Sequence, residues 1–481
     1  MKYNSFNETK VRDFMGKYDI LIVGGSTTGC WFAERMAKEG CKVLVIEKEL
    51  PEDVSRSYDI FHMGEGEMIQ FGLDIPEEGV QPREFRFGSS NMISPYGTYY
   101  KKGADSPVIG LHKHDYIMLM AEKAKNSGAE FIYGAEFTDF VYDASGKIAG
   151  AKYKTADGEQ VAYAKLVADC SGIPSVARRK LPDTSPVCNF KITPKDIFYV
   201  VLYYVKYLDE NVKPREYDGF FMQYKAWSAP AGEGYDAILG IGGSYSYEYS
   251  EEVFNTQFMK NVKYPEYEVK KIEKGMTPYH RSVYSFVDDG FIVMGDAACL
   301  TKPTCGEGCT SSLVQAEIAV DVISTLLKEK LPLTKENMWS INKRYMKAQG
   351  KDFDSLRPLL MGVVTLDFDE AEYMFANDIV FSEALFGAMD GNNLILKGKD
   401  IANWLTQIAS GVAKKKIRMS SIKNLVKGLA QSMEIGMLYD QYPELPEDFA
   451  KWKAKADKKW EEIGSLSETC DPEILKKLGI S

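Results

Sequence analysis

Hydrophobic and polar positions near the start of the chain follow the order strand, turn, helix, strand. Residues 20–23 form a short apolar run, typical of a buried parallel strand, and two glycines follow it directly. Apolar residues then recur at helical spacing over 31–37, and Gly40 ends this predicted helix. Residues 42–46 form a second run rich in strand-forming residues, so the pattern predicts a βαβ unit with a tight turn after its first strand.

The pattern along the rest of the chain predicts further strands and helices. One helix is expected to begin with Asp115 as its cap and to end at Gly128. Residues 197–250 are rich in aromatic and β-branched residues, which favours one antiparallel sheet. This sheet either walls a binding cavity or is an ordinary half-buried sheet. Residues 291–294 form another strand before a glycine-bearing loop, and the pattern beyond residue 328 is helical.

Length, charge and cysteine content exclude several classes of protein. The 481 residues carry a formal net charge of −10, which argues against nucleic acid as a general partner because phosphate binding needs a basic face. No apolar run reaches the length of a membrane span, and residues 1–16 contain no apolar signal core, so we expect a cytoplasmic protein. The eight cysteines are expected to be reduced, and four histidines without ligand spacing predict no metal site.

The turn after the first strand has the residue types of a nucleotide-binding turn. Gly24, Gly25 and Gly29 let backbone amides approach a pyrophosphate at the positive end of the following helix. Ser26 stands where the dinucleotide fingerprint has its middle glycine, and its hydroxyl can donate to a phosphate. Glu47 ends the second strand, where an acidic residue accepts hydrogen bonds from ribose hydroxyls. An ordinary βα turn is the alternative, and it leaves Glu47 unexplained.

Two later strand-to-helix turns carry similar residues. The strand within 164–181 ends in a carboxylate and small residues, so its turn holds either a second part of the dinucleotide or no ligand. The strand over 291–294 ends in Gly-Asp before a glycine-rich helix start, a combination that suits a ribityl chain and an electron-rich ring edge. The residues concerned are Asp169, Ser171 and Gly172 in the earlier turn, and Gly295, Asp296, Gly306 and Gly308 in the later one.

A basic run interrupts the otherwise acidic chain. Residues 413–418 read AKKKIR, and Lys423 and Lys427 follow at helical spacing. A solvated helix face is the favoured interpretation, and contact with anionic lipid headgroups is the alternative.

Together these segments resemble the FAD-dependent geranylgeranyl reductase family, within the flavoproteins that also include p-hydroxybenzoate hydroxylase and the tryptophan halogenases. The FAD motifs cover the first two thirds of the chain, and residues 438–460 are similar to the family's C-terminal region. The resemblance implies an α/β fold: a Rossmann-like FAD-binding domain, an inserted antiparallel β-sheet substrate domain and a helical C-terminal region. The expected segments are 17–50, 105–180 and 281–330 for FAD, 51–104 and 181–280 for substrate, and 331–481 for the helical region.

The resemblance also implies cofactor and substrate contacts. Gly64 and Glu65 are similar to the family segment beside the isoalloxazine, although Met63 stands where the family has cysteine. Trp227 and Pro230 resemble the family's cavity motif. The expected FAD contacts are Gly24, Gly25, Ser26, Thr28, Gly29, Glu47, Lys48, Gly64, Glu65, Asp169, Ser171, Gly172, Gly295, Asp296, Pro303, Gly306, Glu307 and Gly308.

Two substitutions relative to the family pattern bear on chemistry. Ala229 replaces the aromatic residue expected before the proline of the cavity motif, which predicts an altered or wider cavity. Cys299, Cys305 and Cys309 cluster where small residues are usual. Three buried thiols are the favoured interpretation, and a redox-active or metal-binding set is the alternative.

The activity implied by the resemblance is reduction of a carbon–carbon double bond in an isoprenoid lipid or quinone. Reduced FAD would supply a hydride, and an acid would supply the proton. His62, Cys305 and Tyr224 are the candidate acids by position. No second glycine-rich βαβ unit is evident, so the expected electron donor is a ferredoxin-like protein or transiently bound NAD(P)H. An isoprenoid substrate implies peripheral contact with a membrane.

Two other functions fit the same residues. An O₂-using monooxygenase or halogenase keeps the fold, although Lys225 stands where the halogenase motif has its first tryptophan. A flavin-bearing lipid-binding protein with little turnover fits the basic run and the aromatic sheet equally well.

Overall fold

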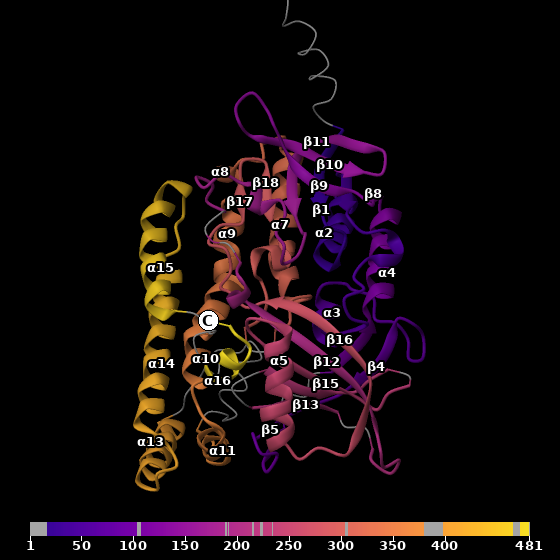
Figure 1. The fold of residues 1–481 in the computed structure, drawn as a ribbon. Coiled ribbons are helices and arrows are strands. Elements are labelled where there is room, and N and C mark those ends of the chain that lie inside the picture. The colour runs from indigo at the N-terminus through magenta and orange to yellow at the C-terminus, as the bar shows by residue number, and fades with distance from the viewer. Residues whose placement is uncertain are drawn as a thin grey trace, which may run out of the picture.

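The computed structural model describes most of the chain and arranges it as three sheets and a helical C-terminal region (Figure 1). Two candidate acids, Tyr224 and Cys305, lie outside the described residues. The described ranges are 17–102, 107–187, 190, 192–213, 216–221, 225–232, 234–303, 306–379, 398–464 and 472–480.

An eight-stranded sheet forms around β1, which lies between β2 and β11 with parallel pairing on both sides. The four apolar residues that end β1 are buried, as expected for a strand covered on both faces. The order continues as β17–β18–β11–β1–β2–β8, and β10 and β9 extend the sheet from the first half of β11. The strands are β1 (Tyr18–Val23), β2 (Val43–Glu47), β8 (Glu130–Tyr133), β9 (Glu136–Tyr142), β10 (Ile148–Thr155), β11 (Gly158–Asp169), β17 (Val287–Asp288) and β18 (Phe291–Val293).

Helices α2 (Thr27–Lys38), α4 (Lys113–Asn126) and α7 (Ser311–Lys328) accompany this sheet, and α2 packs against the other two. The predicted cap residue of α4 is wrong by three residues, since His112 stands at that position in place of Asp115. The helix begins at Lys113, and the Asp115 carboxylate instead pairs with Nδ1 of His112 at 2.8 Å. This earlier start places the Lys113 side chain on the first turn of the helix.

The second sheet has seven strands and is antiparallel except where β13 runs parallel to β5. The prediction of strands as far as residue 250 is wrong at its end. Helix α5 (Tyr247–Val253) begins there, because the Ser246 hydroxyl accepts a hydrogen bond from the Tyr249 amide and caps it. The order is β16 (Tyr267–Pro278), β12 (Ile197–Tyr207), β15 (Ala237–Gly243), β14 (Lys225–Ala229), β13 (Tyr217–Phe220), β5 (Ser90–Ile93) and β6 (Tyr100–Lys102).

A three-stranded antiparallel sheet, β3–β7–β4, is formed by residues that precede α4. Its strands are β3 (Ile60–Gly64), β4 (Arg83–Phe87) and β7 (Val108–His112), and helix α3 (Glu65–Gln70) follows β3 directly. Strand β7 leads into α4, which accompanies the eight-stranded sheet. Along the chain, the small sheet therefore lies between that sheet, called the FAD-type sheet below, and the strands β5 and β6 of the second sheet.

The C-terminal region is helical, as predicted, and its long helices run along one side of the molecule (Figure 1). Helices α10 and α14 pack closely, because a Cβ on Gly428 would lie 2.6 Å from the carbonyl oxygen of Pro358. Among the helices of the described ranges, none is long and apolar enough to cross a membrane. The main helices are α8 (Lys335–Met338), α9 (Ser340–Tyr345), α10 (Lys351–Val363), α11 (Phe368–Ala376), α13 (Gly398–Ala413), α14 (Met419–Tyr439), α15 (Phe449–Ile463) and α16 (Pro472–Lys477).

Candidate functional site

The glycines of the first turn are required by the close packing of three elements. Gly24 has φ +104°, and a Cβ there would lie 2.4 Å from the carbonyl oxygen of Cys170. A Cβ on Gly29 would lie 2.1 Å from the carbonyl oxygen of Gly24. The end of β1, the first turn of α2 and the turn after β11 therefore meet at backbone contact, and larger residues would force them apart.

The start of α2 leaves backbone amides available to an anion. Ser26 is the cap residue, but its side chain makes no capping hydrogen bond, and its hydroxyl lies 3.3 Å from that of Ser55. Glu47 is buried beside this turn and accepts a hydrogen bond from the Gly25 amide at 2.7 Å. Amides at a helix start with a carboxylate at the neighbouring strand end suit the pyrophosphate and ribose of a dinucleotide.

Two further residues assigned to this turn have other contacts. Lys48 is exposed and pairs with Glu49 at 2.9 Å, which raises the pKa of Lys48. Thr28 is buried, and a Cβ on Gly295 would lie 3.0 Å from its hydroxyl oxygen. Thr28 thus packs the first turn against the turn after β18, which begins about 270 residues later in the sequence.

The carboxylate of Asp169 organises its own turn. It is fully buried and accepts hydrogen bonds from the Ser171 amide at 3.0 Å, the Ser171 hydroxyl at 2.6 Å and the Arg178 amide at 2.6 Å. Burial raises the pKa of Asp169, and these hydrogen bonds oppose that change. With Gly172 at φ +73°, the contacts fix the backbone of this turn beside Gly24. Asp169 is therefore a positioning residue.

The turn after β18 brings Asp296 and Gly308 together. A Cβ on Gly308 would lie 2.9 Å from Oδ1 of Asp296, and this oxygen accepts a hydrogen bond from Thr301 at 3.3 Å. Burial raises the pKa of Asp296. Gly306, at φ +72°, and the Pro303 carbonyl, which accepts from Tyr279 at 2.9 Å, complete the loop.

Glu307 caps the long helix α7. Its carboxylate accepts hydrogen bonds from the Thr310 amide at 2.7 Å and the Ser311 amide at 3.1 Å. The Thr310 hydroxyl donates in turn to Glu67 at 2.6 Å, which joins α3 to the start of α7. Burial raises the pKa of Glu307, and the nearby charge of Glu67 adds to this effect.

The segment after β3 carries the predicted residues Gly64 and Glu65. Gly64 is the cap residue of α3, and the Glu65 carboxylate pairs with the Arg86 guanidinium at 2.7 Å. Glu67, which the sequence analysis did not single out, is the residue of this segment that reaches the α7 loop.

Lys113 and Tyr58 are candidate site residues that the sequence analysis did not single out. The Lys113 Nζ lies 3.9 Å from the centre of the Tyr58 ring and donates to Ser57 at 3.1 Å. Burial lowers the pKa of Lys113, and the charge of Asp296 opposes that change. Burial also raises the pKa of Tyr58, and the charge of Asp296 adds to that change. The charge of Asp296 therefore acts on both Lys113 and Tyr58. The sequence signal that could have pointed to Lys113 is a positively charged residue at the start of the helix that follows β7.

An apolar cluster lies beside this group, between the second sheet and the small sheet. Tyr58 packs both against it and against the core of the FAD-type sheet, so the two regions meet at this ring. Trp227 is buried in the cluster, over Gly240, where a Cβ would lie 2.2 Å from the indole; Pro230 is half-buried at the end of β14. The buried members of the cluster are Ile60, Leu202, Tyr204, Trp227, Ala229 and Ile238.

His62 is half-buried on β3, among aromatic rings. Its ring centre lies 5.5 Å from that of Phe85 and 6.1 Å from that of Phe87, and Phe87 stacks on Tyr217. Phe85 also borders the apolar cluster, so His62 is close to its edge.

Of the two cysteines of the turn after β18 that the structure describes, Cys299 is buried and Cys309 is half-buried. Cys299 is buried, and burial raises its pKa to about 12. Burial likewise raises the pKa of the Cys309 thiol. Both thiols are therefore expected to be protonated at neutral pH. Within the described ranges, no three His, Cys, Asp or Glu side chains are grouped to hold a metal ion.

Comparison with known proteins identifies the class to which these turns belong. Residues 17–197 match the protein family described as FAD binding domain. The chain is an FAD-dependent oxidoreductase with this domain, and its cofactor is FAD. Three features of the site fit such a dinucleotide. They are the closely packed glycines of the first turn, the start of α2 without a side-chain cap, and the close contact between Asp296 and Gly308.

Individual relatives are distant but cover most of the chain. A digeranylgeranylglycerophospholipid reductase from Sulfolobus acidocaldarius is 22% identical over 456 residues, which span 92% of this chain and 97% of that protein. A solved geranylgeranyl bacteriochlorophyll reductase-like protein from Thermoplasma acidophilum has a TM-score of 0.63 and 19% identity, covering 83% of this chain and 99% of that chain. A solved flavin-dependent brominase has a TM-score of 0.59 and 19% identity, covering 82% and 99%. The structural likenesses establish the fold that these proteins share.

Proposed function

We propose that the protein reduces carbon–carbon double bonds of an isoprenoid lipid or quinone with electrons from reduced FAD. The observation that carries the proposal is the position of Tyr58, which joins the cofactor segments to an apolar, aromatic cluster on the second sheet. The near full-length similarity to a digeranylgeranylglycerophospholipid reductase supports it. An apolar region beside the cofactor is what a long hydrocarbon substrate requires.

The residues of the chain have separate tasks in this proposal. Gly25 and Glu47 hold the adenosine end, while Asp296 and the amides near Gly308 hold the ribityl and ring end. The Lys113 ammonium, on which the charge of Asp296 acts, balances negative charge at the turn after β18. FAD supplies the hydride when bound. The apolar cluster excludes water and aligns the substrate chain.

Proton delivery is assigned to a side chain at the edge of the apolar cluster. Tyr58 is the first candidate because its ring lies between the cofactor segments and the apolar cluster and its hydroxyl is protonated at neutral pH. Burial raises the pKa of Tyr58 and so makes it a weaker acid than an ordinary tyrosine. His62 lies at the same cluster among phenylalanines and is the second candidate. Tyr58→Phe and His62→Asn test them singly. A loss of about 100-fold or more in turnover assigns the role, and full turnover removes it.

The reaction is tested by photoreducing the FAD-loaded protein without oxygen and adding an unsaturated polyprenyl lipid. We expect the flavin to reoxidise and the lipid to gain two hydrogens for each bond reduced. The saturated lipid serves as the matched control and should leave the flavin reduced. A flavin that stays reduced with every unsaturated lipid or quinone would contradict the proposal.

The second candidate function is an oxygen-using flavoenzyme, a monooxygenase or halogenase. The structural similarity to a brominase and the Trp227–Pro230 segment favour it. In the same experiment, admission of air would then reoxidise the flavin together with hydroxylation or halogenation of an added aromatic substrate.

The proposed double-bond reduction requires an electron donor, either a ferredoxin-like protein or NAD(P)H. Turnover assays from which each donor is omitted in turn identify it.

A further inference from the structure

Helix α14 exposes an apolar stripe. Its exposed apolar side chains are between 40% and 64% accessible, although their neighbours on the helix pack against α10. At 3.6 residues per turn, these positions fall within an arc of about 80°. The stripe consists of Met419, Val426, Leu429, Met433 and Met437.

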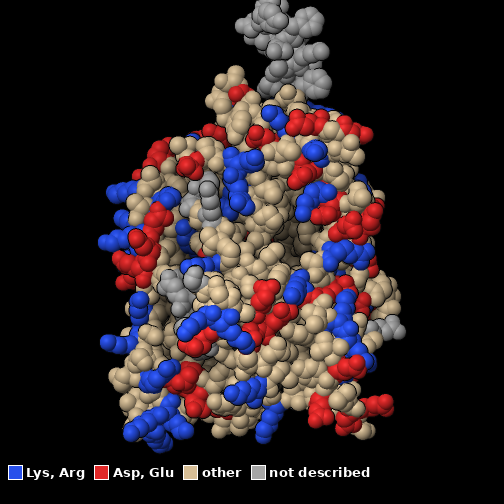
Figure 2. Space-filling model, viewed as in Figure 1, with Lys and Arg blue, Asp and Glu red and all other residues tan. Residues whose placement is uncertain are grey.

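The stripe is bordered by lysines. Between residues 414 and 427 the sequence has six Lys and Arg residues and no Asp or Glu, in a chain of net charge −10. Arg418 is engaged by Glu370, but the lysines are exposed, and none forms an ion pair with another residue of the described ranges. They are Lys414, Lys415, Lys416, Lys423 and Lys427. In Figure 2, Lys and Arg side chains gather at the lower left, the end where Figure 1 places α13 and the start of α14.

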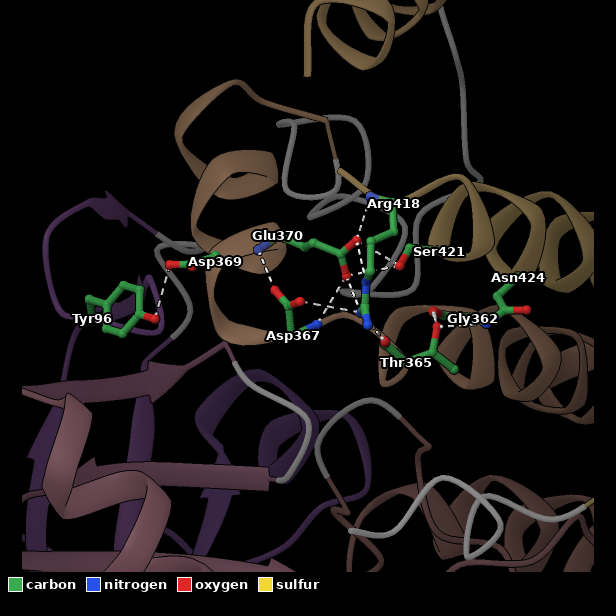
Figure 3. Close-up of polar contacts among 9 residues, drawn as sticks. All are labelled: Tyr96, Gly362, Thr365, Asp367, Asp369, Glu370, Arg418, Ser421 and Asn424. Atoms are coloured by element: carbon green, nitrogen blue, oxygen red, sulfur yellow. Dashed lines mark hydrogen bonds and ion pairs between the residues drawn. The ribbon is translucent and has the colours of Figure 1, made fainter. Parts of the chain in front are cut away.

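The segment 414–418, which carries three of these lysines, is held against the body of the protein by hydrogen bonds. Glu370, buried on α11, accepts hydrogen bonds from the Arg418 amide at 2.7 Å and from its guanidinium at 3.0 and 2.5 Å. The Ser421 hydroxyl donates to the same carboxylate at 2.8 Å (Figure 3). Because these contacts hold both ends of the first turn of α14, the neighbouring lysines and the stripe keep a fixed relative position.

We propose that this stripe and its five lysines form a docking surface for an anionic lipid bilayer. Methionine, valine and leucine side chains can enter the headgroup region, and lysines beside them can reach the phosphates, as in interfacial amphipathic helices. The positive charge gathered at this one surface attracts a negatively charged membrane. The net negative charge of the rest of the chain disfavours docking through any other surface. The inference depends on exposure and charge alone, and it stands whether or not the proposed reaction is correct.

Vesicle binding of the FAD-loaded full chain tests the surface. We expect cosedimentation with phosphatidylglycerol vesicles, weak binding to phosphatidylcholine vesicles, and weakening by salt. The triple variant Lys414→Gln, Lys415→Gln, Lys416→Gln should bind roughly 100-fold more weakly, since each lysine near an anionic surface contributes about 1 kcal/mol. The matched control neutralises three exposed lysines elsewhere, Lys152→Gln, Lys154→Gln and Lys213→Gln, and should bind like the unmodified protein.

A second pair of variants tests the apolar stripe. Met433→Gln with Met437→Gln should also weaken vesicle binding, whereas Ile272→Gln with Met276→Gln, at exposed positions of β16, should not. Equal weakening by the matched controls, or absence of binding to phosphatidylglycerol vesicles, would overturn the proposal. A dimer in light scattering that the methionine variants dissociate would likewise overturn it, because a second copy would then cover the stripe.

Discussion

Two carboxylates at the ends of the strands on either side of β1 show how burial and partners separate residue roles. Glu47 accepts one backbone hydrogen bond at each oxygen, from Gly25 at 2.7 Å and from Glu49 at 3.0 Å. Each carboxylate oxygen has a second lone pair, so Glu47 can still accept from a ribose. Asp169 is fully buried and accepts three hydrogen bonds within its own turn. The sequence assigns both to the cofactor, but their surroundings make one a binding candidate and the other a support.

Glu47→Gln is therefore expected to weaken FAD binding by about tenfold or more. The change replaces one acceptor oxygen with an amide, and hydrogen bonds to charged groups contribute roughly 1.5–3 kcal/mol. Titration of the FAD-depleted protein with FAD, followed by fluorescence, measures the dissociation constant. Glu49→Gln is the matched control, since the Glu49 side chain is more exposed and pairs with Lys48 at 2.9 Å. Equal affinities of the two variants would remove Glu47 from the site.

At the scale of elements, α11 and α14 are joined through one buried carboxylate. Glu370 lies on the first turn of α11, where Asp367 caps the helix and Glu370 completes a capping box (Figure 3). Burial opposes ionisation of Glu370, but hydrogen bonds from Arg418, and then from Ser421, outweigh it and lower the pKa. The carboxylate therefore stabilises the contact between the two helices in its ionised form.

Glu370→Gln should lower the free energy of unfolding at pH 7 by about 1–3 kcal/mol. Because the pKa of Glu370 is lowered on folding, its contribution is complete above the ordinary value of 4.5 and is lost as the pH falls through the folded-state pKa. The difference between wild type and variant should thus shrink in acid. Urea unfolding of both proteins at pH 7 and at an acidic pH below the folded-state pKa measures this difference in the free energy of unfolding.

Asp369→Asn, on the same helix, is the control for this prediction. Asp369 is exposed and accepts from the Tyr96 hydroxyl at 3.1 Å, so its substitution should change stability by less than about 0.5 kcal/mol. A difference between Glu370→Gln and wild type that stays constant with pH would contradict the role assigned to the Glu370 charge.

At the scale of the whole molecule, the candidate cofactor residues come from turns far apart in the chain. Gly25 follows β1, Ser171 follows β11 and Asp296 follows β18, and these three parallel strands are adjacent in the sheet. Carboxyl ends of neighbouring parallel strands meet at one edge, where ligands of open α/β sheets bind. A ligand that touches all three turns opposes the unfolding of the entire sheet.

FAD should accordingly raise the unfolding temperature of the protein. At a free concentration 100 times the dissociation constant, a ligand that binds only the folded state adds about 2.7 kcal/mol. We expect a shift of several degrees in calorimetry with FAD and a much smaller one with riboflavin, which lacks the pyrophosphate and adenosine. Equal shifts with both compounds would show that the Gly24–Gly29 turn does not bind the dinucleotide.

The sequence alone determined the features that neighbouring residues encode. The first βαβ unit, its glycine turn and the helical C-terminal region were predicted, because periodicity and turn chemistry act over a few residues. The α/β fold class is confirmed. The domain boundaries and the site residues stay predictions.

Only the tertiary structure decided which side chains meet. Strand β5 joins the second sheet in parallel with β13, and no local pattern marks a pairing between residues so far apart. Lys113 lies over the Tyr58 ring, and the carboxylates of Asp169 and Glu307 accept hydrogen bonds within their own turns, because burial and partners come from packing. The basic run before α14 likewise became a candidate membrane surface only when the fold left an apolar stripe exposed beside it. Local chemistry fixes the elements, and long-range packing fixes what each side chain can contact.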